Sequence, residues 1–163
     1  MKRIIAILTA LLMLYGAAAA LAEEDSDIEV VLDGETVEFP DQKPVISPEG
    51  RTLVPLRGVF EAAGAEVRWN NDSRIASVIY NDTEIMLQIG ELMYVMRDVP
   101  TNESERKRLP SGVAPAIMND RTLIPLRDVS ELLGFVVEWV DETRTVEITT
   151  NKSPMIRTIV IGE

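Results

Sequence analysis

The sequence contains no cysteine and no histidine. Without cysteine there is no disulfide framework, no thiolate nucleophile, no zinc ribbon and no iron-sulfur cluster. Without histidine there is no Ser-His-Asp triad and no imidazole metal site. Any chemistry would therefore depend on carboxylates, lysine, arginine, tyrosine or hydroxyl groups, and we expect no metal and no cofactor.

Positive charge is also scarce. The 163-residue chain carries 16 Lys and Arg against 27 Asp and Glu, which gives a formal net charge of -11. The densest basic run, Arg106 to Arg108, follows Glu103 and Glu105 and is predicted to form a locally balanced loop. Nucleic acids and anionic membrane surfaces are polyanions that would repel such a chain, so we expect neither as a partner.

Residues 1–22 have the composition of a secretory signal peptide. Lys2 and Arg3 precede a long apolar run, and the small residues Ala20 and Ala22 precede Glu23. Charged, apolar and small segments in this order are typical of a cleaved leader. An uncleaved membrane anchor is the alternative, because the segment from Ile4 to Ala22 could just span a bilayer. We predict cleavage, no membrane insertion afterwards, and a secreted or cell-envelope location.

An internal repeat is the strongest pattern in the chain. The segment RTLVPLRGVFEAAGAEVRWNNDSR begins at Arg51, and RTLIPLRDVSELLGFVVEWVDETR begins at Arg121. The two segments are identical at twelve aligned positions, which is not expected by chance, so the pattern indicates two copies of one structural unit. We predict an acidic leader at 23–27, one domain at 28–150 with copies at about 28–90 and 91–150, and a C-terminal strand or tail at 151–163.

Each copy predicts a short helix that ends at a glycine. Pro55 and Pro125 suit the first helical position, where the missing N–H would have no partner anyway. Gly64 and Gly134 follow at the point where a left-handed backbone closes a helix. Apolar residues between them recur at helical spacing and should be buried. These stripes are Leu56, Val59, Phe60 and Ala63 in the first helix, and Leu126, Val129 and Leu133 in the second.

Alternating residues after each glycine predict two strands joined by a turn. Val67 and Trp69 share one face of the first strand, as Val137 and Trp139 do in the second copy. Each copy is thus a helix-strand-turn-strand unit. We predict an α+β fold in which an antiparallel β-sheet curls around the helices. Further strands are expected at 28–32, 36–39, 84–89, 94–99 and 156–161, with a tight turn at Asp33-Gly34.

The paired motif resembles a known family. The block N/D-G-R-T-L-V-P-L-R, then a helix and G-A-x-V-x-W-[DN], is similar to the copper amine oxidase N-terminal-like domain, also called the stalk domain of bacterial cell-envelope proteins. The resemblance covers about residues 28–150. It implies a five-stranded antiparallel sheet twisted around a helix, in a module that accompanies other domains. The copper and the modified tyrosine of amine oxidases belong to a different domain, so the resemblance implies a stalk without an oxidase.

The chain departs from the family pattern mainly at turns. Asp120 stands where glycine is usual before the second arginine, and Asn70 and Val140 replace the aspartate that usually follows each tryptophan. The segment from Thr101 to Gly112 lengthens the approach to the second copy. We expect a loop there that is particular to this chain.

Four arginines of the motif are candidate ligand contacts. Arg57 and Arg127 lie four residues before Glu61 and Glu131, a spacing that suits helical ion pairs and predicts a supporting role. The alternative is one small anion-binding patch, suited to a carboxylate of a wall polymer. That patch would be formed by Arg51, Arg57, Arg121 and Arg127.

The two tryptophans and the acidic leader also allow two interpretations. Trp69 and Trp139 alternate in phase with valine, which predicts packing against the helices, whereas exposed indoles would suit the faces of sugars. The leader at 23–27 lacks the ligand spacing of a calcium loop and is predicted to be solvated.

No loop combines a nucleophile with a base, so we expect the protein not to be an enzyme. The favoured function is a noncatalytic exported cell-envelope module that binds a wall polymer or a surface protein, or acts as a spacer. The alternative is a protein-partner or homodimerisation module that uses an edge strand, with 156–161 as the candidate. A small carboxylate-dependent hydrolase is the third hypothesis.

Overall fold

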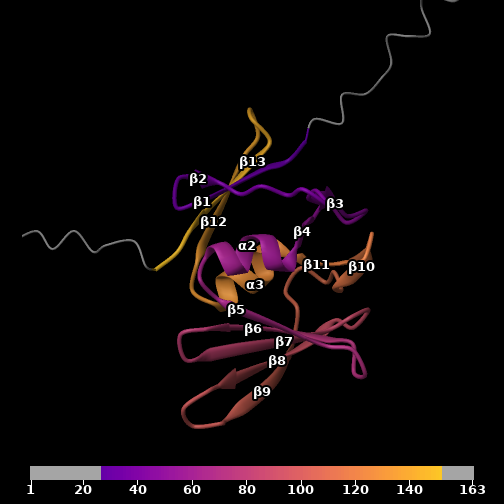
Figure 1. Ribbon diagram of the computed structural model, residues 1–163, viewed down its shortest axis with the longest axis vertical. Coiled ribbons are helices and arrows are strands. Elements are labelled where there is room, and N and C mark those ends of the chain that lie inside the picture. The colour runs from indigo at the N-terminus through magenta and orange to yellow at the C-terminus, as the bar shows by residue number, and fades with distance from the viewer. Residues whose placement is uncertain (1–26, 152–163) are drawn as a thin grey trace, which may run out of the picture.

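The computed structural model describes residues 27–151, whose elements are shown in Figure 1. Two short helices stand among many short strands: α2 (Leu56–Ala62) and α3 (Leu126–Leu132). The predicted signal peptide and the predicted strand at 156–161 lie outside the described residues. The strands in chain order are β1 (Glu29–Leu32), β2 (Glu35–Thr36), β3 (Val45–Ile46), β4 (Thr52–Pro55), β5 (Glu66–Asn70), β6 (Ile75–Tyr80), β7 (Thr83–Gln88), β8 (Met93–Asp98), β9 (Ser104–Arg108), β10 (Ala116–Met118), β11 (Arg121–Pro125), β12 (Val136–Val140) and β13 (Thr145–Thr149).

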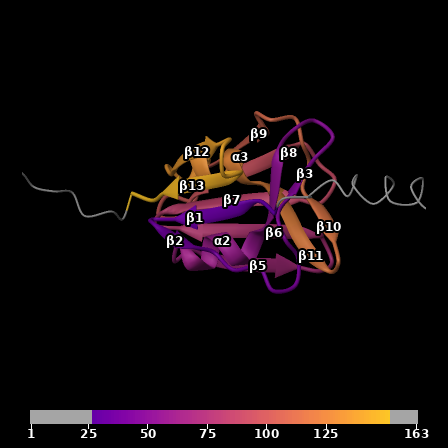
Figure 2. The same ribbon diagram turned by 90° about the horizontal axis from the view of Figure 1, so that it is seen from above.

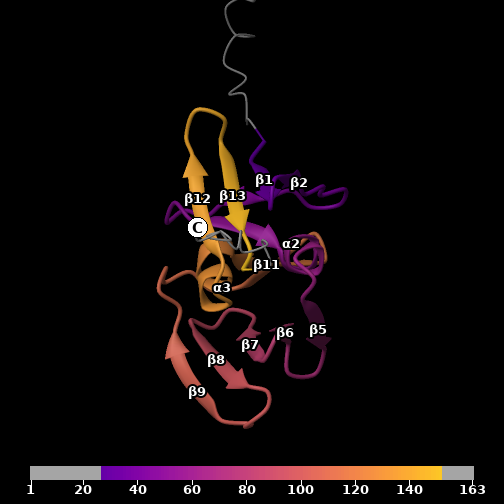
Figure 3. The ribbon, with the colours of Figure 1, turned by 90° about the vertical axis from the view of Figure 1, so that its left-hand side faces the viewer.

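The strands form three sheets. Two are four-stranded, with the orders β12-β13-β1-β2 and β10-β11-β4-β3, and the third is five-stranded, with the order β5-β6-β7-β8-β9. Figures 1 and 3 place both helices between the five-stranded sheet and the strands β1, β2, β12 and β13. Mostly β-structure curled around two helices agrees with the predicted α+β class.

The sheets differ from the single antiparallel sheet that the sequence predicts. Besides their division into three, β1 pairs with β13 in parallel, with Val30 opposite Val146. Parallel pairing needs a long connection, and almost the whole described chain separates these two strands. The N–H and the hydroxyl of Thr150 both donate to the carboxylate of Asp33, over 2.8 and 2.6 Å. The beginning and the end of the described chain are thus fastened together.

Both helices begin beside proline and end at glycine, as predicted. Pro55 and Pro125, predicted as the first helical residues, are instead the N-caps, so each helix begins one residue later. Each proline also ends a strand. Gly64 and Gly134 have φ angles of 82° and 80°, the left-handed conformation expected of a helix end. The predicted apolar stripes of both helices are buried. Within residues 27–151, neither helix has the length and hydropathy to cross a membrane.

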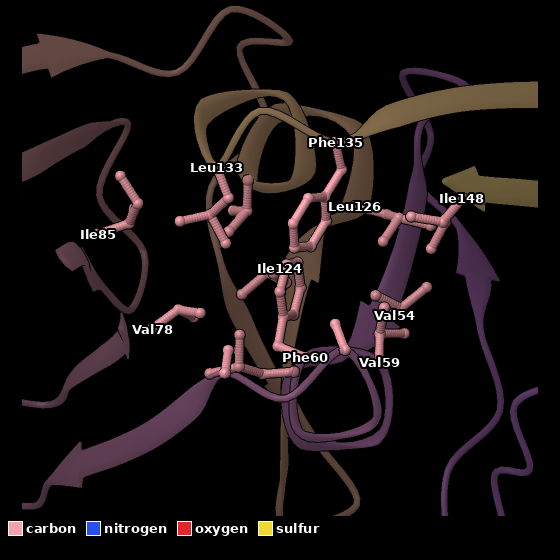
Figure 4. Close-up of a cluster of buried hydrophobic side chains, with 14 of the residues drawn as sticks. Val54, Val59, Phe60, Val78, Ile85, Ile124, Leu126, Leu133, Phe135 and Ile148 are labelled. Carbon is pink, nitrogen blue, oxygen red and sulfur yellow. The ribbon is translucent and has the colours of Figure 1, made fainter. Parts of the chain in front are cut away.

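One hydrophobic core contains side chains of both sequence copies (Figure 4). Phe60 of α2 and Phe135, which follows α3, stack with ring centroids 6.4 Å apart. In the aligned sequence copies, Phe60 corresponds to Ser130, and Phe135 corresponds to Ala65. Each copy therefore supplies one aromatic ring where the other has a small residue, so the two copies fill one core jointly.

Aligned positions of the two sequence copies meet in the sheet β10-β11-β4-β3. β4 pairs with β11 in antiparallel fashion, with Val54 opposite Ile124, which are aligned residues of the two copies. The two hairpins therefore extend in opposite directions from this pair. The β10–β11 hairpin lies on the side of α2 and β5, whereas β3 lies on the side of α3 (Figure 2).

After each helix the chain forms a strand, a turn and a second strand. α2 is followed by β5 and β6, which pair with Trp69 opposite Ala76, and α3 is followed by β12 and β13, with Trp139 opposite Val146. The turn at Asp33 and Gly34 joins β1 to β2, as predicted. The predicted strand at 36–39 is shorter, because β2 ends at Thr36.

The segment predicted as a loop at 101–112 contains a strand instead. Residues Ser104–Arg108 form β9, which pairs with β8 and is exposed along its whole length. Its composition has no apolar alternation, so periodicity alone did not reveal it. Charged side chains are typical of an edge strand, since they discourage pairing with another chain.

Candidate functional site

Two open grooves contain the motif residues. The α2 groove, as we name it, has a volume of about 630 Å³ and lies between α2, β5 and the β10–β11 hairpin. The α3 groove has a volume of about 550 Å³ and lies between α3, β12 and the β3–β4 hairpin. In each groove the hairpin comes from the sequence copy that does not supply the helix, because β4 and β11 run antiparallel.

Aligned residues of the two copies occupy corresponding places in the two grooves. Each groove is lined by a proline, by the arginine at the start of the helix and by a glutamate one turn later. A valine and a tryptophan of the strand after the helix also line it, as does an arginine of the opposite hairpin. These are Pro40, Arg57, Glu61, Val67, Trp69 and Arg121 in the α2 groove, and Pro110, Arg127, Glu131, Val137, Trp139 and Arg51 in the α3 groove.

The four motif arginines are therefore divided between two places. Arg57 and Arg121 line the α2 groove, whereas Arg51 and Arg127 line the α3 groove. The four arginines do not form the single patch considered from the sequence. Instead, the arginine of each helix lies in one groove with the hairpin arginine of the other copy. Contact with a ligand remains a prediction for all four.

The helical arginines form the ion pairs predicted from their spacing. Arg57 Nε lies 3.8 Å from Glu61 Oε1, and Arg127 Nε lies 3.9 Å from Glu131 Oε1. All four side chains are more than half exposed. Exposed pairs of this kind contribute little to stability, about a few tenths of a kcal/mol, so both arginines can reorient toward a ligand at small cost.

The tryptophans are less buried than the predicted packing against the helices requires. Trp69 is 36% exposed on the edge strand β5, which corrects the expectation of a core side chain for this residue. Trp139 is half-buried and packs against the core, and its Nε1–H donates to Asp141 Oδ1 over 2.6 Å.

The hairpin arginines differ in their partners. Arg121 Nη2 donates to Asp41 Oδ2 over 2.5 Å, and this hydrogen bond and the charge of Asp41 raise the pKa of Arg121 above its ordinary value. Arg51 is exposed and forms no ion pair with any residue in the range 27–151. In the α2 groove the hairpin arginine is thus bound to a carboxylate of the same chain, whereas, among residues 27–151, the hairpin arginine of the α3 groove is not.

A second difference lies on the helices. Gly58 of α2 aligns with Asp128 of α3. A Cβ atom on Gly58 would lie 2.9 Å from the ring of Phe39, so this ring packs directly on the helix. Asp128 is buried, and its Oδ2 accepts hydrogen bonds from the N–H and the hydroxyl of Ser111, over 3.0 and 2.7 Å.

Asp41 and Ser111 were not singled out by the sequence analysis, although a signal exists. Both follow a proline that is preceded by a large apolar residue, in Phe39-Pro40-Asp41 and Leu109-Pro110-Ser111. Extending the internal alignment toward the N-terminus from Arg51 and Arg121 would have paired them. Ile46 and Ile117, which line the two grooves and are 45% and 43% exposed, were also missed because their strands are very short.

The side chains that line the grooves are suited to binding an anionic group. Within the part of the chain that the structure describes, no group of three or more acidic side chains is placed to hold a metal ion. Glu84, the one glutamate that is buried among residues 27–151, pairs with Arg97 in the five-stranded sheet and lies outside both grooves. Guanidinium groups beside indole and aliphatic side chains suit an anionic group that carries an apolar neighbour.

Comparisons with known proteins give a family and one relative. A family model described as "Copper amine oxidase N-terminal domain" matches residues 31–148 and, again, residues 103–160. A protein of Brevibacillus choshinensis named "Protease inhibitor" is 29% identical over 129 residues, which cover 78% of this chain and 36% of that protein. The chain thus spans about a third of the length of that relative. No solved structure matches significantly.

Proposed function

Because the chain belongs to the copper amine oxidase N-terminal domain family, whose model covers most of its length, we propose that it is a noncatalytic binding module of the cell envelope. The resemblance inferred from the paired motif is confirmed by this match. The family description names an N-terminal domain of an oxidase. A chain without histidine is suited to an accessory role in such a protein rather than to copper chemistry.

The duplicated groove is the observation that carries the proposal. Exposed arginines, a tryptophan and an exposed isoleucine recur at corresponding places in both grooves. A hydrophobic core does not require exposed guanidinium groups, and their recurrence beside the same kinds of side chain in both grooves supports a binding role. We propose that the two helix-strand-turn-strand units are copies of one structural unit, each of which contributes half of each groove.

The proposed location depends on the leader. Residues 1–22 have the pattern of a cleaved signal peptide, and their removal would leave an acidic chain that begins at Glu23. A chain without cysteine is also indifferent to an oxidising compartment. On this basis the module acts outside the cytoplasm, as a secreted or envelope-bound protein that binds a wall polymer or an envelope protein.

A protein partner is the more specific candidate of the two. The relative from Brevibacillus choshinensis is named a protease inhibitor, a function that would require contact with another protein. Large apolar side chains are exposed on three edge strands, at Ile46 of β3, Ile117 of β10 and Val136 of β12. Edge strands with apolar side chains can add a strand from a partner. The same edges offer a route to a homodimer.

Sedimentation of the mature chain with envelope fractions tests the proposed function. We expect retention on intact walls, on purified insoluble peptidoglycan or on extracted envelope proteins, with retention weakening as salt is raised because guanidinium contacts are screened. A variant with Arg51, Arg57, Arg121 and Arg127 all changed to Gln should lose retention. An acidic protein of similar size serves as the control.

Two results would contradict the proposal. Equal sedimentation of the fourfold variant and the wild-type chain would show that the grooves are not used. Hydrolysis of a wall polymer or a peptide by the purified chain, abolished by a single acid-to-amide substitution, would show an enzyme instead.

A further inference from the structure

The two grooves share their arrangement but differ in one carboxylate. In the α2 groove, Asp41 accepts a hydrogen bond from the hairpin arginine Arg121 over 2.5 Å. In the α3 groove the corresponding residues are Ser111 and Arg51, which line the groove together. Arg51 forms no ion pair with any of residues 27–151, and its side chain is exposed.

The α2 groove already contains a peptide, which is part of the chain itself. The segment from Phe39 to Asp41 lines this groove. The ring of Phe39 packs on the helix at Gly58, and the Asp41 carboxylate reaches Arg121. The bound elements are therefore an apolar side chain and, two residues later, a carboxylate.

The aligned segment from Leu109 to Ser111 places no carboxylate in the α3 groove. Leu109 is fully buried in the core, and both donors of Ser111 are used by Asp128. Neither residue places a carboxylate on Arg51. The α3 groove also has the more balanced lining, with two carboxylates and two guanidinium groups against four and three in the α2 groove.

We propose that the α3 groove binds an acidic peptide segment of a partner protein. A glutamate or aspartate carboxylate of that peptide is held by Arg51, with Arg127 beside it. An aliphatic neighbour lies against Ile46 and the half-buried Trp139. The inference rests on the proposed binding function and specifies its ligand. The contact between Arg121 and Asp41 shows, in the same chain, that a hairpin arginine binds a carboxylate.

A peptide fits the α3 groove better than a glycan does. A sugar ring needs several hydrogen-bonding partners, but the polar groups of this groove are largely used within the chain. Asp128 and Ser111 bond to each other, and the Trp139 Nε1–H is held by Asp141. What remains is Arg51, together with Arg127, whose exposed ion pair with Glu131 is 3.9 Å long. Both lie beside aliphatic surface that includes Ile46 and Val137, which suits a carboxylate with an aliphatic neighbour.

Calorimetric titration with short peptides tests this inference. The probe is acetyl-Val-Glu-Val-amide, and the matched control is acetyl-Val-Gln-Val-amide, which differs only in the charge. We expect binding of the glutamate peptide to the mature chain at low salt, and affinity at least tenfold lower for the glutamine peptide, since a charge-assisted hydrogen bond contributes roughly that factor.

Variants of aligned residues locate the site. Arg51→Gln should lower the affinity for the glutamate peptide at least tenfold, and Arg51→Lys should lower it less. Arg106→Gln is the control and should leave the affinity unchanged, because Arg106 is an exposed arginine of β9 that lines neither groove. Asp41→Ser, which copies the residue of the α3 groove, should free Arg121 and add a second binding event. That second event should disappear when Arg121→Gln is added.

Three outcomes would overturn the inference. They are the absence of binding of the glutamate peptide at millimolar concentration, equal binding of that peptide to the wild-type chain and to Arg51→Gln, and the absence of a second binding event in folded Asp41→Ser. Glucuronate as a second probe separates the sources of the carboxylate, and Arg51-dependent binding of glucuronate stronger than that of the peptide would reject a peptide ligand. If Arg51→Gln is still retained on envelope fractions, the inference fails and the proposed function stands.

Discussion

Gly134 shows how one residue's backbone conformation ends a helix. Its φ of 80° lies in the left-handed region, and a Cβ atom there would meet only Asn151 Nδ2 at 3.7 Å, an ordinary contact. The expected cost of Gly134→Ala is therefore conformational, about 1 kcal/mol of unfolding free energy. Gly134→Asn should cost less, because asparagine tolerates this conformation.

Urea unfolding of these variants measures the effect. A cost for Gly134→Ala no larger than for alanine at an exposed site with negative φ would contradict the conformational explanation. Gly58 is not a suitable control, because alanine there would collide with Phe39.

Tyr80 and Tyr94, the two tyrosines among residues 27–151, predict a loss of stability at alkaline pH. Burial is the main cause that raises the pKa of Tyr80 and of Tyr94, and the charge of Asp33 adds to the rise at Tyr80. In the unfolded chain these phenols ionise near pH 10, roughly their ordinary value. The stabilisation is complete below that pH and is lost as the pH rises through the higher folded values, because the unfolded chain then binds fewer protons.

Unfolding free energies measured by urea between pH 8 and the onset of alkaline denaturation test this dependence, with phenolate absorbance as a second readout. The double variant Tyr80→Phe and Tyr94→Phe should lose less stability over the same pH interval. Tyr80→Phe alone also removes the hydrogen bond from its hydroxyl to Asn151 Oδ1, 2.9 Å long, so its stability at neutral pH is the necessary reference. Ordinary phenol titration in the folded chain would contradict the prediction.

At the scale of elements, the seven-residue helices depend on packing. Helices this short are not stable alone in water, so their apolar faces must be held by the core. Phe60 is fully buried and stacks on Phe135. Truncation by Phe60→Ala should lower the unfolding free energy by about 3–5 kcal/mol, because it removes apolar contacts and leaves a cavity.

Arg57→Ala in the same helix is the matched control, since its side chain is exposed and its ion pair is long. We expect a cost below about 0.5 kcal/mol for this variant in urea unfolding. Similar costs for the two substitutions would mean that α2 is not anchored by its buried face.

The sequence predicts elements well where periodicity is long enough to read. The apolar stripes of both helices, the glycine ends and the alternating strands β5, β6, β12 and β13 all follow from residue patterns. Short strands such as β3, with two residues, have no readable period, and the charged β9 has no apolar face. Both acquire strand structure from their pairing partners, which sequence patterns do not specify.

The candidate site is only half visible in the sequence. The motif identifies the four arginines, but not that an antiparallel pair places Arg51 with Arg127 and Arg121 with Arg57. Nor does it reveal the Asp41 contact, which joins residues far apart in the chain. These contacts depend on the antiparallel pairing of β4 with β11, which sets the relative orientation of the two copies. No local sequence pattern encodes that orientation.

At the scale of the whole molecule, the two sequence copies should unfold as one unit. They share a single main core, and β1 near one end of the described chain pairs with β13 near the other. Asp33 and Thr150 fasten the same two ends. Neither copy buries its apolar face without the other, so a single cooperative transition is expected.

Two single-tryptophan variants test this cooperativity, because the chain has only two tryptophans and each belongs to one copy. Trp139→Phe leaves Trp69 as the reporter of the first copy, and Trp69→Phe leaves Trp139 as the reporter of the second. Urea transitions followed by fluorescence should coincide with those followed by circular dichroism in each variant. Different midpoints for fluorescence and circular dichroism within one variant would mean that the copies unfold separately, and each groove, built from both copies, would then be lost when the weaker copy unfolds.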